Sequence, residues 1–312
     1  MLRTITVISF AAAVVCGASA ARADDAATCK TVRLSDLGWT DIALTNATAE
    51  LLLEPLGYRV EQTILGLDVT YLSLQNNDID VFQGNWRPVQ DEQFKSYFDE
   101  GSVEPLGVNL EGAKYTLAVP KYVSDAGVIG FGDLAAHAEK FDRKIYAIEP
   151  GSNQPLLDMV AAGRHGLSDW EIVESSEAGM LAQVRKSIPA ERWVVFLGWE
   201  PHPMNLDFEI TYLAGGDVEF GPNFGGATVR TLSRKGYSAE CPNVARFFTN
   251  LVFDLDYENY GMRMITADSL SPADAAREMI RKDASKLEKW LAGVETLDGG
   301  PATPAVRSAL GL

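Results

Sequence analysis

The chain has 312 residues, of which 46% are hydrophobic and 22% charged, and its formal net charge is -16. This acidity repels nucleic acid and anionic lipid head groups, and no basic stripe or tail offers those partners a binding surface. The charge favours a soluble protein and, more weakly, a cationic ligand, although solubility alone would also account for it.

The amino-terminal 23 residues have the three parts of a secretory signal peptide. Arg3 gives a positive start, residues 5–15 are apolar and uncharged, and Ala21-Arg22-Ala23 forms a small-x-small cleavage site. The apolar stretch is too short for an ordinary membrane anchor. We therefore predict a signal peptide over residues 1–23. The mature chain then starts at Asp24 with a formal charge of -18, because cleavage removes two arginines and no acidic residue.

The mature chain alternates between strand and helix signals, a pattern typical of an α/β protein with mostly parallel sheets. In chain order, its first part predicts a strand at residues 31–34, a helix at 43–56, a strand at 58–64, a short helix at 69–75 and a strand at 80–83. The middle part predicts a strand at 144–148, a helix at 155–162, a strand at 172–174, a helix at 177–188 and a strand at 193–197. The last part is helical at 243–253 and at 271–291, where Ser271 and Pro272 make a good helix start.

Two cysteines remain once Cys16 leaves with the signal peptide. Cys29 and Cys241 are an even pair in an oxidising compartment, so we expect one disulfide between them. Closing a loop of this length contributes about 4–5 kcal/mol in the chain-entropy model, less any strain. Two separate buried thiols are the alternative.

Roughly 290 mature residues are more than one hydrophobic core usually serves, so we expect two lobes. The disulfide would place both ends of the chain in the same lobe. Lobe A is therefore predicted to contain residues 24–118 together with 212–312, and lobe B residues 119–211. The chain then crosses between the lobes twice, which makes a hinge that can close around a ligand.

Three tryptophans share one predicted context, in which an apolar strand ends, a glycine lies at or near its end, and the tryptophan follows. They occur in Leu37-Gly38-Trp39, Gly84-Asn85-Trp86 and Leu197-Gly198-Trp199. Ligands of open parallel sheets bind beyond the carboxyl ends of the strands, so we expect these indoles at a crevice between the lobes. Trp170, Trp193 and Trp290 lack this context and are assigned to packing.

An indole face attracts a methylated cation without asking it for hydrogen bonds. Each such contact is worth about 0.5–2 kcal/mol. Three or four rings would therefore supply a large part of a micromolar affinity, which corresponds to roughly -8 kcal/mol. Packing in the core is the alternative role for each ring.

Seven segments spread over almost the whole mature chain form a specific set of motifs. They are residues 37–41 (LGWTD), 78–86 (DIDVFQGNW), 112–117 (GAKYTL), 148–151 (IEPG), 174–183 (ESSEAGMLAQ), 196–205 (FLGWEPHPMN) and 220–229 (FGPNFGGATV). In these motifs the chain resembles the choline-binding proteins of ABC importers, within the wider group that binds glycine betaine and proline betaine.

The resemblance implies an α/β, two-lobed periplasmic-binding-protein fold of type II, the Venus-flytrap fold. It implies a periplasmic monomer without cofactor or metal that delivers its ligand to a membrane permease driven by a cytoplasmic ATPase. It also implies an aromatic box of Trp39, Trp86, Tyr115 and Trp199 with the acid Asp41 beside it, and it supports the disulfide.

Asp41 also makes sense from its chemistry, because a carboxylate beside the box supplies the counter-charge to a bound cation. Capping the helix that follows is its alternative role. The chain departs from the family after Gly151. The family pattern continues with Asn-Asp-Gly-Asn, whose first Asn holds the ligand hydroxyl, whereas this chain has Ser152-Asn153-Gln154-Pro155 and is two residues shorter.

Ser152 or Asn153 would replace that polar contact. The same residues precede a helix whose free N–H groups would accept a carboxylate. We therefore expect an onium ligand, with choline first and glycine betaine, dimethylsulfoniopropionate and trimethylamine N-oxide as alternatives.

Two other classes of protein compete with this interpretation. An enzyme such as a hydrolase is disfavoured because His137, His165 and His202 form no metal-spaced pair and no nucleophile elbow is present. His202 is interpreted as a local turn contact, and the acids Asp78 and Asp80 as exposed residues. A sugar-binding receptor would need many planar polar side chains, and the three tryptophan segments offer few.

Overall fold

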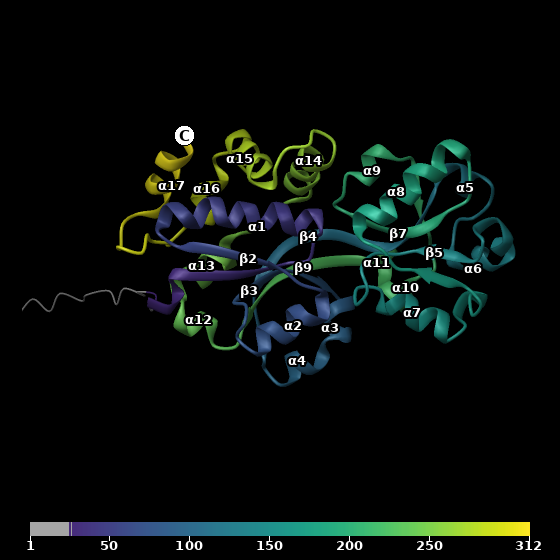
Figure 1. Cartoon of the computed structure of the whole chain (residues 1–312), viewed down its shortest axis with the longest axis horizontal. Coiled ribbons are helices and arrows are strands. Elements are labelled where there is room, and N and C mark those ends of the chain that lie inside the picture. The colour runs from purple at the N-terminus through teal and green to yellow at the C-terminus, as the bar shows by residue number, and fades with distance from the viewer. Residues whose placement is uncertain (1–24, 26) are drawn as a thin grey trace, which may run out of the picture.

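The computed structural model describes Asp25 and residues 27–312, so the predicted signal peptide lies outside the described residues. Figure 1 shows two lobes side by side along the long axis of the molecule. One contains both ends of the described chain, and the other contains α5 to α9 with β5 and β7. In the part of the chain that is described, no helix is both long and apolar enough to cross a membrane.

A single sheet path runs through both lobes in the order β2-β1-β3-β9-β4-β7-β5-β6, with β8 paired to β4. The strands are β1 (Thr31–Asp36), β2 (Arg59–Ile64), β3 (Val81–Arg87), β4 (Val103–Pro120), β5 (Lys144–Tyr146), β6 (Glu171–Val173), β7 (Val195–Glu200), β8 (Ile210–Tyr212) and β9 (Gly226–Arg234). The sets β2-β1-β3 and β7-β5-β6 are parallel, as the alternation of strand and helix predicts.

The long strand β4 joins the two parallel sets. It pairs antiparallel with β9 from Val103 to Lys114, and then with β7 from Lys114 to Ala118. Neither β4 nor β9 is among the strands predicted from the sequence. The proposed division at residues 118–119 and 211–212 stays a prediction, and β4 passes from one set of partners to the other close to the first of these positions.

Helices cover both faces of the sheet in each lobe (Figure 1). They are α1 (Thr40–Leu53), α2 (Leu67–Gln75), α3 (Val89–Gln93), α4 (Lys95–Asp99), α5 (Lys121–Asp125), α6 (Phe131–Leu134), α7 (Gln154–Ala161), α8 (Glu177–Ser187), α9 (Met204–Asp207), α10 (Asp217–Phe220), α11 (Pro222–Gly225), α12 (Tyr237–Glu240), α13 (Pro242–Asn250), α14 (Leu255–Thr266), α15 (Pro272–Lys282), α16 (Lys286–Trp290) and α17 (Ala302–Leu310). As predicted, Ser271 caps α15 by accepting a hydrogen bond from the Asp274 N–H at 3.1 Å.

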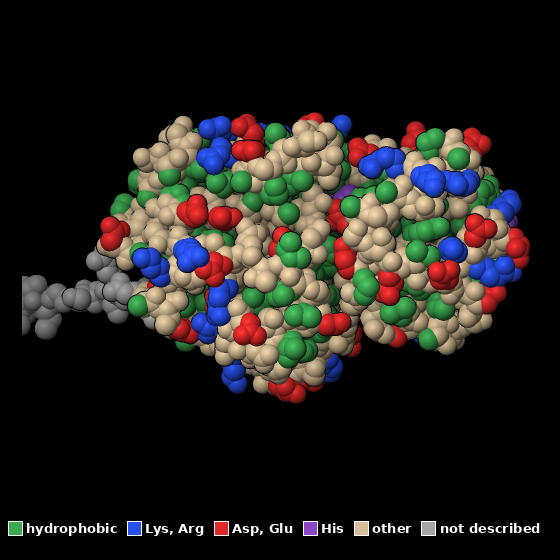
Figure 2. All heavy atoms as spheres, viewed as in Figure 1, with side chains coloured by type: hydrophobic (Ala, Val, Ile, Leu, Met, Phe, Trp, Pro, Cys, Tyr) green, Lys and Arg blue, Asp and Glu red, His purple; other side chains and the backbone are tan. Residues whose placement is uncertain are grey.

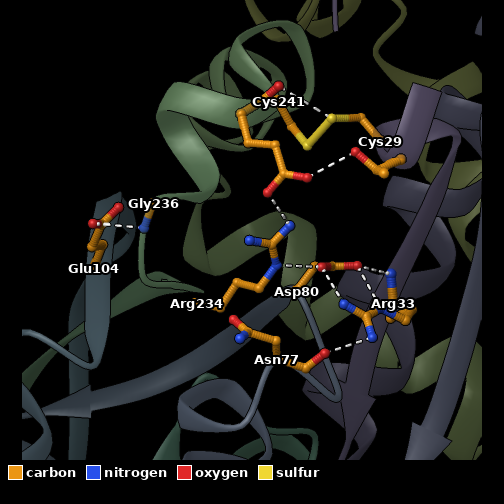
Figure 3. Close-up of polar contacts among 10 residues, drawn as sticks. Cys29, Arg33, Asn77, Asp80, Glu104, Arg234, Gly236 and Cys241 are labelled. Carbon is orange, nitrogen blue, oxygen red and sulfur yellow. Dashed lines mark hydrogen bonds and ion pairs between the residues drawn. A yellow bond between two sulfur atoms is a disulfide. The ribbon is translucent and has the colours of Figure 1, made fainter. Parts of the chain in front are cut away.

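The predicted disulfide is present, with a Cα–Cα distance of 5.6 Å between Cys29 and Cys241 (Figure 3). It ties the start of β1 to the start of α13, which lie in the same lobe. The disulfide therefore joins two segments of the same lobe that are 212 residues apart in the sequence.

Asp80 corrects one expectation, since this acid is buried and not exposed. Its carboxylate accepts hydrogen bonds from Arg33 Nε at 2.9 Å and from Arg234 Nε at 2.8 Å, and Arg234 also reaches Glu240 beside the disulfide (Figure 3). Burial alone would raise the pKa of Asp80, but the bonds from the two guanidinium groups outweigh it and hold the pKa below its ordinary value. The neighbouring Asp78 is exposed, as expected.

Candidate ligand site between the lobes

A cavity of about 620 Å³, its mouth included, lies between the two lobes. One lobe lines it with Trp39, Asp41 and Trp86, and the other with Ser152, Glu177 and Trp199. Tyr115 of β4 lines the cavity where the lobes join. Figure 2 shows acidic side chains along the groove that separates the lobes on the viewed face.

Trp39 reaches the cavity through a tight turn between β1 and α1. The turn needs glycine, because Gly38 has φ +76°, a conformation that L-residues with a side chain rarely adopt. Trp39 then occupies the N-cap position of α1 with an extended backbone. Its indole Nε1–H donates to Glu149 of the other lobe at 2.9 Å, which leaves the ring face free for the cavity.

The other two tryptophans reach the cavity from within strands, which corrects the expectation that all three follow a strand end. Trp86 lies in β3 and Trp199 in β7. In the antiparallel pairing of β4 with β7, Tyr115 stands directly opposite Trp199. Residues that oppose each other in a ladder share a face of the sheet, so both rings point to the same side.

The glycines before these two tryptophans serve packing and not a turn. A Cβ on Gly84 would lie 2.6 Å from Ile42 Cδ1, and one on Gly198 would lie 3.0 Å from Ala118 Cβ. Glycine is also needed at Gly225 on the cavity wall, where a Cβ would lie 1.9 Å from the Tyr115 carbonyl oxygen. At these three positions the backbone therefore lies too close to neighbouring atoms for a larger residue to fit without a shift.

The four rings line the cavity without filling it. Trp39, Trp86 and Trp199 are 7–8% exposed. Across residues 25 and 27–312, none of these three indoles stacks on another, and Trp86 meets Tyr115 at a centroid distance of 6.4 Å and a tilt of 53°. The ring faces therefore remain available to a ligand.

Asp41 is buried on the cavity wall in the first turn of α1. It is not the N-cap, because Trp39 holds that position; its Oδ1 accepts a hydrogen bond from the Ile42 N–H at 2.8 Å. Burial and the nearby Glu177 carboxylate raise the pKa of Asp41 to about 7, against the opposing hydrogen bonds from Ile42 and Trp86. A cation in the cavity would favour the ionised form.

Glu177 lines the cavity but is not among the site residues predicted from the sequence. It opens α8 in one lobe and caps α1 of the other, because its carboxylate accepts hydrogen bonds from the Thr40 N–H at 3.1 Å and from the Thr40 hydroxyl. His202 Nε2 lies 3.2 Å from the same carboxylate. Since His202 Nδ1 accepts a hydrogen bond from the Met204 N–H at 3.0 Å, the imidazole proton sits on Nε2 and points to Glu177.

The hydrogen bonds and the burial of Glu177 shift its pKa in opposite directions. Burial would raise that pKa, but the hydrogen bonds from His202 and Thr40 hold it below its ordinary value. The local turn contact expected for His202 is confirmed by its bond to Met204, and the contact with Glu177 adds to it. A sequence signal existed only as the acid within the ESSEAG motif, with nothing to indicate its partner 137 residues away.

Ser152 and Asn153, which lie where the chain departs from the family pattern, have different surroundings. Ser152 lines the cavity, and in the described chain its hydroxyl has no hydrogen-bond partner, while its carbonyl accepts a bond from the Tyr115 hydroxyl at 3.0 Å. Asn153 is fully buried and does not line the cavity. Its amide donates to the Ile148 and Glu149 carbonyls at 2.9 and 3.0 Å. The structure thus gives Asn153 a positioning role in place of the predicted ligand contact.

The remaining tryptophans pack as expected. Trp170 and Trp193 lie against Phe141, and Trp290 lies between aromatic rings of α14 and the loop before it. None of the three lines the cavity within the described residues.

Comparison with known proteins agrees with this arrangement. Residues 30–282 match the family described as the substrate binding domain of the ABC-type glycine betaine transport system. The solved structure of an ABC-transporter choline binding protein in complex with choline is 50% identical, with a TM-score of 0.89 over 91% of this chain and 99% of that one. Lactococcal OpuAC in its closed-liganded conformation with glycine betaine is 25% identical, with a TM-score of 0.75 over 83% of this chain and 98% of that one.

A curated relative is the glycine betaine/carnitine transport binding protein GbuC of Listeria monocytogenes. It is 27% identical over 163 residues, which are 52% of this chain and 53% of the relative, so the match spans about half the length of GbuC. The family match, in contrast, covers most of this chain. The protein therefore belongs to the family of substrate-binding domains of ABC-type glycine betaine transport systems, with the two-lobed α/β fold of that family.

Proposed function

We propose that this protein captures an onium cation, choline in the first place, in the cavity between its lobes and delivers it to an ABC importer. One observation carries the proposal. Five aromatic rings, the four of the box and Phe220, line one cavity together with two carboxylates, and Arg87, the basic residue among the described lining residues, is paired with Asp91 at 2.6 Å. Both the ring faces and the carboxylates of such a site attract a positively charged ligand.

The ligand's trimethylammonium group would lie among Trp39, Trp86, Tyr115 and Trp199. Four cation–π contacts at about 0.5–2 kcal/mol each sum to roughly 2–8 kcal/mol before the costs of binding. The carboxylate of Asp41 adds Coulomb attraction to the same positive charge. The 50% identical relative that holds choline supports this placement.

The two acids also favour choline over a zwitterion. The carboxylate of glycine betaine would approach Asp41 and Glu177 without an unpaired cationic side chain to receive it. A hydroxyl needs only a small polar partner, and Ser152 offers an unoccupied hydroxyl on the cavity wall. Glycine betaine remains the second candidate, because the family description and lactococcal OpuAC point to it.

A sugar fits this cavity poorly. The uncharged planar amide side chains that line the cavity are Gln90 and Gln93, and each already donates to a backbone carbonyl, of Gly84 at 2.9 Å and of Gly151 at 2.7 Å. We also propose that the protein is not an enzyme, since the acids beside the cavity act as counter-charges and no nucleophile–base pair faces the space that the ligand would occupy in the described residues.

The transport role follows from the family. We infer that the protein works as a periplasmic monomer, exported through a cleaved signal peptide, and that its partners are a membrane permease and a cytoplasmic ATPase. The proposed role needs no cofactor and no metal.

Tryptophan fluorescence of the mature protein tests the proposal directly. Choline, glycine betaine, dimethylsulfoniopropionate, trimethylamine N-oxide and a panel of sugars would be titrated separately. We expect saturable binding of choline at micromolar or lower concentration and none of the sugars. Glycine betaine binding more tightly than choline would move the substrate to the zwitterions, and failure of all the methylated ligands would reject the function.

A further inference from the structure

Glu177 belongs to one lobe, and its carboxylate accepts two hydrogen bonds from the other lobe. Thr40 donates to it from both its backbone N–H and its hydroxyl, and these groups begin α1 in the opposite lobe. The free N–H groups of a helix start favour a negative partner, so the carboxylate stabilises the closed arrangement of the lobes. Opening the cleft would break these bonds.

The same carboxylate brings a second negative charge to the cavity when the lobes close. Asp41 stands on the wall formed by α1, and Glu177 on the wall formed by α8. Both side chains are buried in the closed arrangement, with 7% and 5% of their surface exposed. Two buried carboxylates on one cavity repel each other unless a positive charge lies between them.

A second acid makes a useful contrast. Glu149 also bridges the lobes, since it accepts the Trp39 indole N–H at 2.9 Å and the Glu177 N–H at 3.0 Å. It does not line the cavity, however. Glu149 therefore supplies an interlobe hydrogen bond without placing its charge on the ligand.

We propose that Glu177 is a specificity-determining residue that makes closure of the lobes depend on a positive charge in the ligand. The aromatic rings also contact the apolar surface of a neutral trimethyl group, but without the cation–π attraction that a positive charge adds. Closure around such a neutral group leaves the Asp41 carboxylate and the Glu177 carboxylate on one cavity with no positive charge between them, whereas a cation supplies that charge. This inference rests on the proposed onium-binding function.

The test compares choline with 3,3-dimethyl-1-butanol, its neutral carbon isostere, by calorimetric titration at pH 8. The wild-type protein is compared with E177Q and with E149Q, which removes an equal charge and an equal interlobe acceptor outside the cavity. We expect the ratio of choline to isostere affinity to fall about tenfold or more in E177Q, because the like-charge repulsion that penalises a neutral ligand is relieved. In E149Q both affinities should fall together and the ratio should stay within about threefold.

T40V tests whether loss of an interlobe hydrogen bond alone changes the affinity ratio. It removes the hydroxyl donor to Glu177 and keeps the negative charge of Glu177. Its affinities should fall for both ligands with the ratio preserved. An unchanged ratio in E177Q, with choline still bound by the wild type, would overturn the inference while leaving the onium function intact. Absence of choline binding in the wild type would reject the proposed function itself.

Discussion

Lowering the pH should weaken choline binding through Asp41. Burial, with the Glu177 carboxylate, raises the pKa of Asp41 to about 7 in the empty cavity. A bound cation favours the carboxylate and lowers this pKa, so binding requires the ionised form. The contribution of Asp41 to affinity is therefore present above pH 7 and is lost as the pH falls through 7.

The size of the effect follows from the ionised fraction of Asp41. With a pKa of about 7, roughly nine-tenths of the side chain is ionised at pH 8 and roughly a tenth at pH 6. The association constant for choline should therefore fall about tenfold between these values, equal to about 1.4 kcal/mol. At pH 7 binding should release about half a proton, which calorimetry in buffers of different ionisation enthalpy measures.

The groups around Asp41 define the control. Glu177, which is hydrogen-bonded to His202, lines the same cavity as Asp41. Glu258 of α14 is a further nearby acid: burial raises its pKa, and the negative charge of Asp41 raises it further. D41N should bind choline more weakly and show an affinity that is nearly flat between pH 6 and 8. An unchanged pH dependence in D41N, or a wild-type affinity that does not vary with pH, would refute the reasoning.

Three further predictions concern binding and stability. Trp199→Ala should weaken choline binding by about 1–2 kcal/mol or more without unfolding the protein, whereas Trp193→Phe, far from the cavity, should leave the affinity unchanged in the same titration. Replacing Cys29 and Cys241 with serine should lower the free energy of unfolding by up to about 4–5 kcal/mol in urea denaturation while choline still binds, and equal stability with and without a reductant would contradict this. Asp80→Asn should cost about 2–4 kcal/mol by the same measurement, because two partly buried guanidinium groups lose their counter-charge; a change below about 0.5 kcal/mol would show that solvent compensates them.

Much of the fold could be predicted because the local signals agree with the tertiary structure. The strands and helices between Thr31 and Val81 fall close to their predicted positions, and Gly57 ends the first helical segment with φ +97°. The disulfide could be predicted from the compartment and from the even number of mature cysteines. The long strands β4 and β9 were missed; Gly107 and Gly112 interrupt the pattern of β4, and its pairing with β9 contains register shifts that no local pattern encodes.

The candidate site divides in the same way. Trp39, Trp86 and Trp199 could be found from their motifs, although the glycines before the last two serve close packing within strands and not turns. Glu177 could not be found, because its role depends on a contact that forms only when two lobes meet. Asn153 was misplaced because the sequence cannot show that its amide is satisfied by the loop after β5.

A crystal structure of the mature protein with choline tests the central claim most directly. We predict that the ammonium nitrogen lies within about 6 Å of the ring centroids of Trp39, Trp86, Tyr115 and Trp199, with the Asp41 carboxylate beside it and the hydroxyl directed to Ser152. Density for choline outside this cavity, or within it but with the ammonium away from the four rings, would contradict the account.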